Sequence, residues 1–166
     1  MSGFTIKKAE EKDTGIILGF IKKLAEYEKL EKEVTATEEL LKENLFGESA
    51  VAECLIGYYD NTPVCFAIYF FNFSTFLAKP GLYLEDLFVL PEYRGKGFGK
   101  AMLVRLAQIA KEKKCGRFEW AVLDWNEPAL KFYESLGAIK LDDWIIHRVT
   151  GKALDKLANE TVTIIK

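Results

Sequence analysis

The sequence predicts a mixed α/β (α+β) fold, in which a central and mostly antiparallel sheet is flanked by helices. Two apolar runs, 50–59 and 64–73, are separated only by the turn-forming residues "DNTP" and therefore indicate an antiparallel hairpin. A third run, "GLYLEDLFVL" (81–90), precedes a glycine-rich loop and a helical pattern, and "RFEWAVL" (117–123) follows as another strand. An antiparallel meander that continues as β-α-β is typical of one sheet with helices packed on it.

The N-terminal part predicts one strand and two helices before the hairpin. The run "FTIKKA" is strand-like, and Asp13 is a suitable N-cap for a helix whose apolar residues recur on one face. A second helix is expected in "TATEELLKENLFG", where Thr35 and Glu38 have the spacing of a capping box and Gly47 is a natural stop.

The C-terminal part predicts a further helix in "NEPALKFYESLGA". Asn126 is its expected N-cap, Pro128 lies in its first turn, and Gly137 ends it. The run "WIIHRV" (144–149) is expected to form a strand, and residues 151–166 a short helix followed by a strand.

Composition and charge exclude several classes of protein. Of the 166 residues 49% are hydrophobic, which is enough for one core and predicts a single domain over 1–166. The formal net charge of −2 argues against a nucleic-acid partner. No apolar run is long enough to span a bilayer, and the charged start of the chain is unlike a signal peptide. The three cysteines lack metal-binding spacing, so we expect reduced thiols, no metal and a cytoplasmic location.

The stretch "PEYRGKGFGKAM" (91–102) contains the strongest local motif. Its glycines at 95, 97 and 99 match neither the dinucleotide fingerprint nor the P-loop, because the spacing and the following residue differ. Glycines before a helix allow backbone N–H groups to approach a phosphate closely, and Arg94, Lys96 and Lys100 add positive charge. A glycine-rich turn without a ligand, or Arg94 in a structural ion pair, are the alternatives.

The stretch "VLPEYRGKGFGKAML" resembles the acetyl-CoA pyrophosphate loop of the GNAT superfamily of N-acetyltransferases, and "NEPALKFYESLGA" is similar to that family's second cofactor segment. Together with "LAEYEKLEKEV", these motifs resemble the spermidine/spermine (diamine) N-acetyltransferase group from about Phe4 to Ala158, whereas "ETVTIIK" has no match. The resemblance implies acetyl-CoA as co-substrate, a homodimer, and a sheet that is splayed at the acetyl-CoA strand. The expected cofactor-binding residues are Leu87, Phe88, Val89, Arg94, Gly95, Lys96, Gly97, Phe98, Gly99, Lys100, Asn126, Glu127, Pro128 and Ala129.

The resemblance also implies two catalytic residues, Glu85 and Tyr133. Direct proton transfer from an ammonium of pKa about 10.4 to a carboxylate of pKa about 4.3 is uphill by roughly 8 kcal/mol, which favours Glu85 as an anchor and relay through water. A phenol of pKa about 10 can protonate a leaving thiolate of pKa about 8.5 at a cost of only ~2 kcal/mol. The alternative for Tyr133 is a core tyrosine beside Phe132.

An acidic surface is expected to bind the acceptor amine. Residues 26–39 contain six glutamates and two lysines, and the resemblance places Tyr27 and Glu28 of this segment against the substrate. Glu85, Asp86 and Trp120 are the other expected substrate-binding residues, with Glu85 and Asp86 on opposite faces of their strand because side chains alternate. The alternative is a solvated helix end with scattered glutamates.

These observations favour an N-acetyltransferase that transfers acetyl from acetyl-CoA to a primary amine of a small polycation, such as spermidine or spermine, by direct attack in a ternary complex. The runner-up is an acetyltransferase of a lysine analogue (thialysine-like) or another amino-acid side-chain amine, which would need a cation for the carboxylate. A protein N-terminus acetylator is less favoured. From a different class, a non-catalytic CoA-binding module is the remaining alternative.

Overall fold

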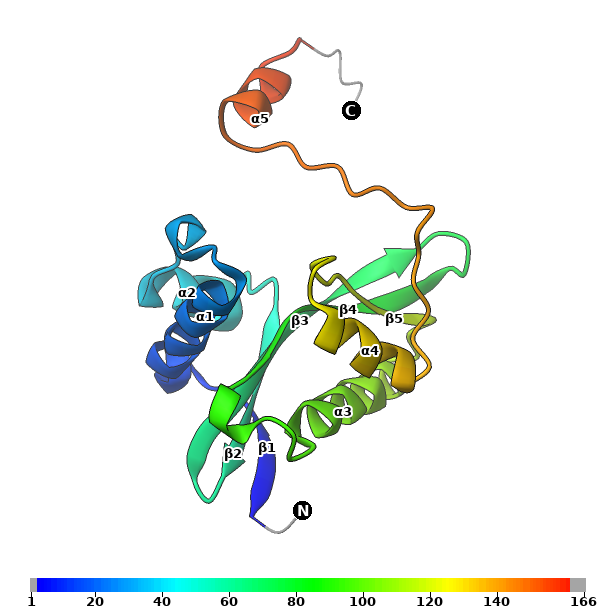
Figure 1. Cartoon of the computed structure of the whole chain (residues 1–166). Coiled ribbons are helices and arrows are strands. Elements are labelled where there is room, and N and C mark those ends of the chain that lie inside the picture. The colour runs from blue at the N-terminus through cyan, green and yellow to red at the C-terminus, as the bar shows by residue number, and fades with distance from the viewer. Residues whose placement is uncertain (1–2, 162–166) are drawn as a thin grey trace. The chain divides into compact units, whose positions relative to one another are not determined.

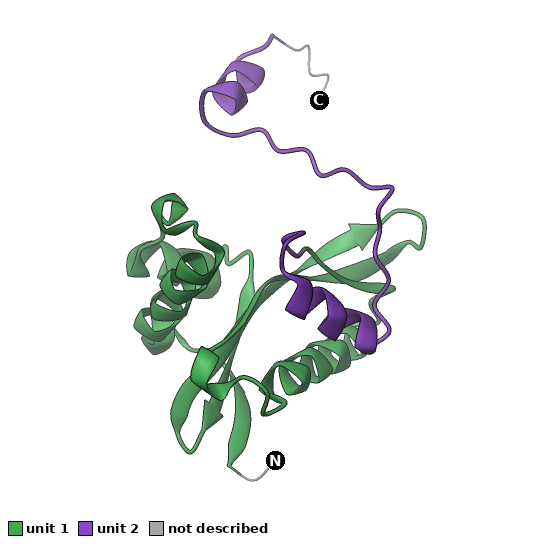
Figure 2. Ribbon diagram, in the orientation of Figure 1, with its two compact units in different colours: residues 1–121 green, residues 122–166 purple. Residues whose placement is uncertain are grey.

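The computed structural model describes residues 3–161, and the chain divides into two compact units, 1–121 and 122–166 (Figure 2). A single domain over 1–166 stays a prediction. None of the described helices is both long and apolar enough to cross a membrane.

The first unit is built on a five-stranded sheet in the order β1-β2-β3-β4-β5 (Figure 1). Its strands are β1 (Phe4–Lys8), β2 (Glu53–Tyr59), β3 (Thr62–Ser74), β4 (Lys79–Val89) and β5 (Arg117–Trp120). Strands β1 to β4 pair antiparallel with their neighbours, and β5 pairs parallel with β4. The predicted mixed and mostly antiparallel sheet is therefore confirmed.

Three helices pack on this sheet, namely α1 (Thr14–Glu28), α2 (Glu38–Phe46) and α3 (Phe98–Glu112). Phe20 of α1 stacks on Phe66 of β3 with the ring centroids 5.2 Å apart. Phe98 at the start of α3 stacks on Phe4 of β1 with a centroid distance of 4.3 Å. Helices α1 and α2 lie on one side of the sheet and α3 on the other, as the α/β pattern requires (Figure 1).

Strand β4 has two strand partners over only part of its length. It pairs with β5 from Gly81 to Leu84, and beyond that point only with β3. Ile68 pairs with Asp86 and Tyr69 with Leu84, so Glu85 is the extra residue of a β-bulge. In the part of the chain that the structure describes, no strand lies on the open side of β4 after Leu84, which confirms the expected splay.

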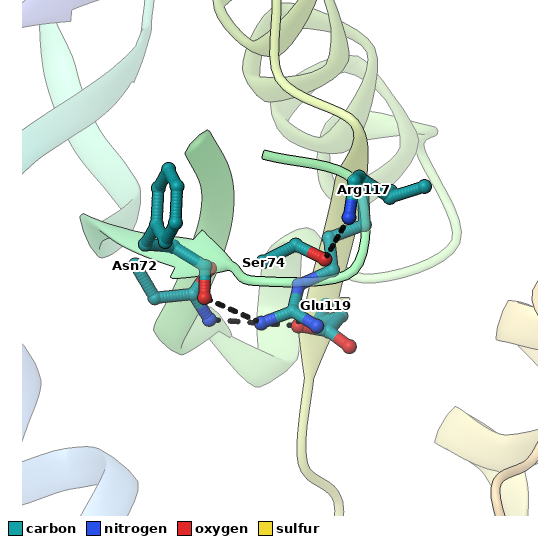
Figure 3. Close-up of polar contacts among 6 residues, drawn as sticks. Asn72, Ser74, Arg117 and Glu119 are labelled. Atoms are coloured by element: carbon teal, nitrogen blue, oxygen red, sulfur yellow. Dashed lines mark hydrogen bonds and ion pairs between the residues drawn. The ribbon is translucent and has the colours of Figure 1, made fainter. Parts of the chain in front are cut away.

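The opposite end of β5 is tied to β3 by polar contacts (Figure 3). Arg117 Nε forms an ion pair with Glu119 Oε2 at 2.8 Å, and Asn72 Nδ2 donates to the same oxygen at 3.5 Å. Arg117 Nη2 donates to the carbonyl of Phe73 at 3.5 Å. These contacts tie β5 to β3 across β4, while the pairing of β5 with β4 itself runs only from Gly81 to Leu84.

The helix caps differ in detail from those predicted. Asp13 precedes α1 as expected, but its carboxylate accepts the N–H of Glu10 at 2.9 Å instead of an α1 N–H. The cap of α2 is Thr37, whose hydroxyl accepts the Leu40 N–H at 3.2 Å, so the capping box predicted from Thr35 is wrong. The helix begins later than the spacing suggested, because Thr37 offers an equally good cap two residues closer to the apolar residues.

The second unit contains α4 (Glu127–Ser135) and α5 (Gly151–Ala158). Asn126 caps α4 as predicted, since its Oδ1 accepts the N–H of Ala129 at 3.4 Å. Gly137 has a φ of +85° just after the helix, in agreement with its expected role as terminator.

The strand predicted over 144–149 is wrong. Trp144, Ile145 and Ile146 are exposed and form no strand, although the short helix expected next is present as α5. A strand needs a neighbour for its backbone hydrogen bonds, and among the described residues no strand pairs with 144–149. Strand β5 also ends at Trp120, earlier than the predicted residue 123. The strand expected at the C-terminus falls mainly on residues 162–166, outside the described residues.

Candidate active site

The glycine loop between β4 and α3 has the backbone of an anion cradle. Gly95 and Gly97 have φ values of +76° and +83°, a region that side chains with a Cβ disfavour. Gly97 is the N-cap of α3, and no side chain caps its first N–H groups. A Cβ built on Gly95 would meet no atom within 4 Å, so space for a ligand exists beside the backbone. These features suit a phosphate group at the positive end of the helix dipole.

Arg94, the first residue of the loop, lies over two aromatic rings. Its guanidinium carbon is 4.5 Å from the ring centroid of Tyr27 and 5.4 Å from that of Phe88. Its Nε donates to the carbonyl of Val89 at 3.0 Å. The predicted alternative of a structural ion pair is therefore replaced by cation–π stacking, which the sequence analysis did not anticipate.

Lys96 also lies against aromatic rings, on a different cluster. Its Nζ is 4.9 Å from the ring centroid of Tyr93 and 5.5 Å from that of Tyr59. Phe98 belongs to the same cluster, with its ring 5.3 Å from Tyr59 and almost fully buried. The Phe98 side chain is thus part of the core, so only its backbone is available for the expected cofactor contact. Gly99 is half-buried and Lys100 is exposed.

Three carboxylates of the first unit interact across the end of α1 and the bulge of β4. Burial, and then the charges of Glu85 and Glu28, raise the pKa of Asp86 to about 6. Burial also raises the pKa of Glu28. The side chains do not follow simple alternation at this point, because the extra residue Glu85 breaks it. Glu28 and Asp86 are half-buried and Glu85 is exposed, so the cluster is open to solvent on one side. Neighbouring carboxylates of this kind favour a bound ammonium group.

The remaining glutamates of residues 26–39 are solvated. Glu26, Glu31, Glu33, Glu38 and Glu39 are all exposed, and only Glu28 is half-buried. Of the expected acidic surface, the structure therefore brings Glu28 together with Glu85 and Asp86.

The expected strand residues lie where β4 leaves β5. Phe88 is buried, whereas Leu87 and Val89 are half-buried on the stretch of β4 that has lost its β5 partner. Trp120 pairs with Leu84 as the last pair of β4 and β5. The open side of β4 offers backbone groups to an extended ligand.

The second cofactor segment lies in the other unit and has local partners of its own. The N–H of Ala129 is used by Asn126, and Pro128 has no N–H to offer. Glu127 forms an ion pair with Lys131 at 3.3 Å. Tyr133 is half-buried, with its ring 5.4 Å from that of Phe132. The functional roles of this segment stay predictions.

The cysteines are unsuited to nucleophilic catalysis. Burial raises the pKa of Cys54 and of Cys65 to about 12, and it also raises the pKa of Cys115. A nucleophilic cysteine requires a lowered pKa, because the thiolate is the reactive form.

Comparison with known proteins agrees with this geometry. The acetyltransferase (GNAT) family model matches residues 18–138, and the chain belongs to this family. It is therefore an acetyltransferase, built on a fold whose members generally use acetyl-CoA.

Two related sequences and one solved structure are similar to this chain over nearly its full length. A thialysine N-epsilon-acetyltransferase from Sus scrofa is 39% identical over 96% of this chain and 100% of that protein. The human spermidine/spermine N(1)-acetyltransferase-like protein 1 is 34% identical over 96% of this chain but only 24% of that protein. Among solved structures, an integron cassette protein from V. cholerae has a TM-score of 0.81 and 28% identity, and the match covers 96% of this chain and 100% of that one.

The raised pKa of Asp86 predicts a pH-dependent effect of Asp86→Asn on stability. Between the ordinary pKa of 3.8 and about 6 the folded chain binds more protons than the unfolded chain, so this carboxyl group destabilises the fold as pH rises. Asp86→Asn should therefore increase the free energy of unfolding at pH 8, by up to about 3 kcal/mol, and have little effect near pH 4. Urea unfolding at four pH values measures the difference.

Glu39→Gln is the matched control, because hydrogen bonds to its own backbone and to Thr37 lower the pKa of Glu39. Its effect on stability should have the opposite sign at pH 8. An Asp86→Asn effect that does not grow between pH 4 and 8 would contradict the assigned environment of Asp86.

Proposed function

We propose that this chain transfers acetyl from acetyl-CoA to the side-chain amine of an amino acid of the lysine type, with thialysine as the model substrate. The observation that carries this proposal is the full-length similarity to a thialysine N-epsilon-acetyltransferase, at 39% identity. The acidic cluster of Glu28, Glu85 and Asp86 supports it, since a side-chain ammonium needs such a partner.

A polyamine substrate such as spermidine or spermine is the second candidate. It is supported by the same carboxylates and by the spermidine/spermine-like human relative. That relative is less similar, and most of the glutamates expected to attract a long polycation are dispersed in solvent. We therefore propose the amino acid as the preferred substrate and the polyamine as the second candidate.

In the proposed reaction, acetyl-CoA supplies an acetyl group already activated as a thioester. The backbone of Gly95 to Gly97 and the start of α3 hold its phosphates, while the open side of β4 provides hydrogen bonds along Leu87 to Val89. Direct attack by the amine fits the raised pKa values of the three thiols, which leave no activated cysteine for an acetyl-enzyme.

The carboxylates prepare the amine for attack. Glu85 anchors the ammonium and relays its proton through water. Asp86 lowers the free-energy cost of removing that proton, because its own pKa is raised. Transfer from an amine of pKa about 10.4 to a carboxylate whose pKa is about 6 is uphill by roughly 6 kcal/mol, against roughly 8 for an ordinary glutamate. Tyr27, Glu28 and Trp120 complete the proposed acceptor site, and Tyr133 is proposed to protonate the departing thiolate. A cytoplasmic homodimer is proposed on the resemblance.

Substitution of Gly97 tests the phosphate cradle. Asparagine tolerates a positive φ, so Gly97→Asn should keep the melting temperature within a few degrees while its side chain obstructs the phosphate. Losing one charge-assisted hydrogen bond should raise the Kd for CoA about tenfold or more by calorimetry. Gly151→Asn is the control, since Gly151 also has a positive φ, of +52°, with nothing within 4 Å of an added Cβ. Unchanged CoA affinity in Gly97→Asn would overturn the cradle.

A pair of matched amines tests the substrate class. Thialysine and bis(2-aminoethyl) sulfide differ only in the carboxylate, so the ratio of their kcat/KM values isolates its recognition. If a protein group pairs with this carboxylate, kcat/KM should fall about tenfold or more when it is missing, in line with a charged hydrogen bond. Thiol release from acetyl-CoA measures the rates, and spermidine and spermine complete the panel. Equal rates for the matched pair, with spermidine preferred, would favour the polyamine candidate.

Removing the phenol oxygen tests the proposed acid. In Tyr133→Phe, kcat should fall by about 10²–10⁴-fold with modest changes in both KM values, because protonation of the thiolate occurs only in the transition state. Single-turnover kinetics show whether chemistry limits the rate. Glu134→Gln on the same helix, an exposed position, controls for general effects on α4. Full kcat in Tyr133→Phe would assign the proton to another group.

A further inference from the structure

The side chain of Arg94 connects the two halves of the candidate site in the first unit. It belongs to the glycine loop by sequence, yet it lies 4.5 Å from the ring centroid of Tyr27 at the end of α1. We propose that Arg94 is a positioning residue whose stack on Tyr27 couples CoA binding at the glycine loop to amine binding beside Glu28. This proposal rests on the proposed function and adds to it an energetic link between the two ligands.

The stack acts on the part of α1 that carries the acceptor residues. Helix α1 ends at Glu28, where Lys29 has a φ of +61° and the N–H of Leu30 bonds back to the carbonyl of Ala25 at 2.8 Å. Tyr27 also packs on Phe88 of β4, with the ring centroids 6.4 Å apart. Helix ends fray readily, so contacts in the last turn decide whether Glu28 is held beside β4.

Glu28 in turn belongs to the carboxylate cluster. Its charge contributes to the raised pKa of Asp86, as does that of Glu85, which places the three groups within electrostatic reach of one another. An ammonium ion bound there interacts with Glu28 only when the end of α1 is packed. The packed end is therefore the state to which the amine binds more tightly.

The other end of Arg94 depends on the glycine loop. Its N–H bonds to the carbonyl of Pro91 at 3.2 Å, its Nε to that of Val89 at 3.0 Å, and Gly95 follows with a φ of +76°. A phosphate held by the N–H groups of this loop fixes the loop backbone and with it the base of the Arg94 side chain. Binding of CoA then favours the stacked arrangement, and by linkage the amine must strengthen CoA binding by the same factor.

Lys96 provides an internal comparison. It also belongs to the loop and also stacks on an aromatic ring, but its partners are Tyr93 and Tyr59 instead of a residue of α1. Loss of the Tyr93 ring should therefore leave the coupling in place, whereas loss of the Tyr27 ring should abolish it.

Calorimetry with CoA tests the coupling without turnover, because CoA carries no acetyl group. The Kd for CoA is measured with and without a saturating amine, which is thialysine on the proposed function, for wild type, Tyr27→Leu, Tyr27→Phe and Tyr93→Leu. In wild type the amine should lower the Kd for CoA on the order of tenfold. The factor should persist in Tyr27→Phe and Tyr93→Leu and fall below about twofold in Tyr27→Leu, by the same principle.

If Tyr27→Leu does not fold, Arg94→Lys provides the same test, because Arg94 is the exposed residue of the stack. It keeps the charge but loses the planar guanidinium and the bond from Nε, so the coupling should fall. Combined with Tyr27→Leu it should lose no more coupling than either change alone.

Coupling that persists in Tyr27→Leu, that is absent in wild type, or that is lost equally in Tyr27→Phe and Tyr93→Leu would overturn the proposal. In each of these cases acetylation of thialysine by wild type, measured in parallel by thiol release, would leave the proposed function standing. Absent coupling in a wild type that does not acetylate thialysine would count against the proposed substrate. No CoA binding by wild type would instead overturn the proposed function itself, so the two failures are distinct.

Discussion

The candidate site depends on one break in strand pairing, directly after Leu84. From Gly81 to Leu84 β4 is bonded on both sides, and beyond Leu84 β3 is its one strand partner among the described residues. The bulge at Glu85 falls at the same place, and Arg117 and Glu119 connect β5 to Phe73 and Asn72 of β3 by polar contacts (Figure 3). Because the pairing with β5 stops at Leu84 and the bulge follows directly, the open side of β4 and the redirected carboxylates lie within a few residues of each other.

The same break explains the electrostatics. At the bulge Asp86 is half-buried and lies within reach of two other negative charges, which raises its pKa to about 6. The cluster is therefore costly for the folded protein alone, and a cation removes much of that cost. Where the folded protein holds like charges close together, binding of an opposite charge relieves the repulsion, and groups with such shifted pKa values are frequent at functional sites.

Sequence reasoning succeeded where the determinants are local and failed where they are distant in the chain. The positive φ values at Gly95 and Gly97 follow from the loop itself, and the sheet order follows from the succession of apolar runs. The bulge at Glu85 depends on the register between β3 and β4, and the stack of Arg94 on Tyr27 on the packing of α1 against β4. Residues 144–149 have a strand-like pattern, but a pattern does not supply the neighbour that a strand needs.

The acidic cluster by itself leaves the choice among amines open. Carboxylates attract any ammonium group, so both of the proposed substrates, thialysine and spermidine, would gain from Glu28, Glu85 and Asp86. Discrimination is a difference between two binding free energies and must come from what the substrates do not share. For these two molecules that difference is a carboxylate on one side and a second or third ammonium on the other. A cation placed to pair with the substrate carboxylate would favour the amino acid and repel the polyamine. A single positively charged side chain would therefore be enough to select between the two substrate classes.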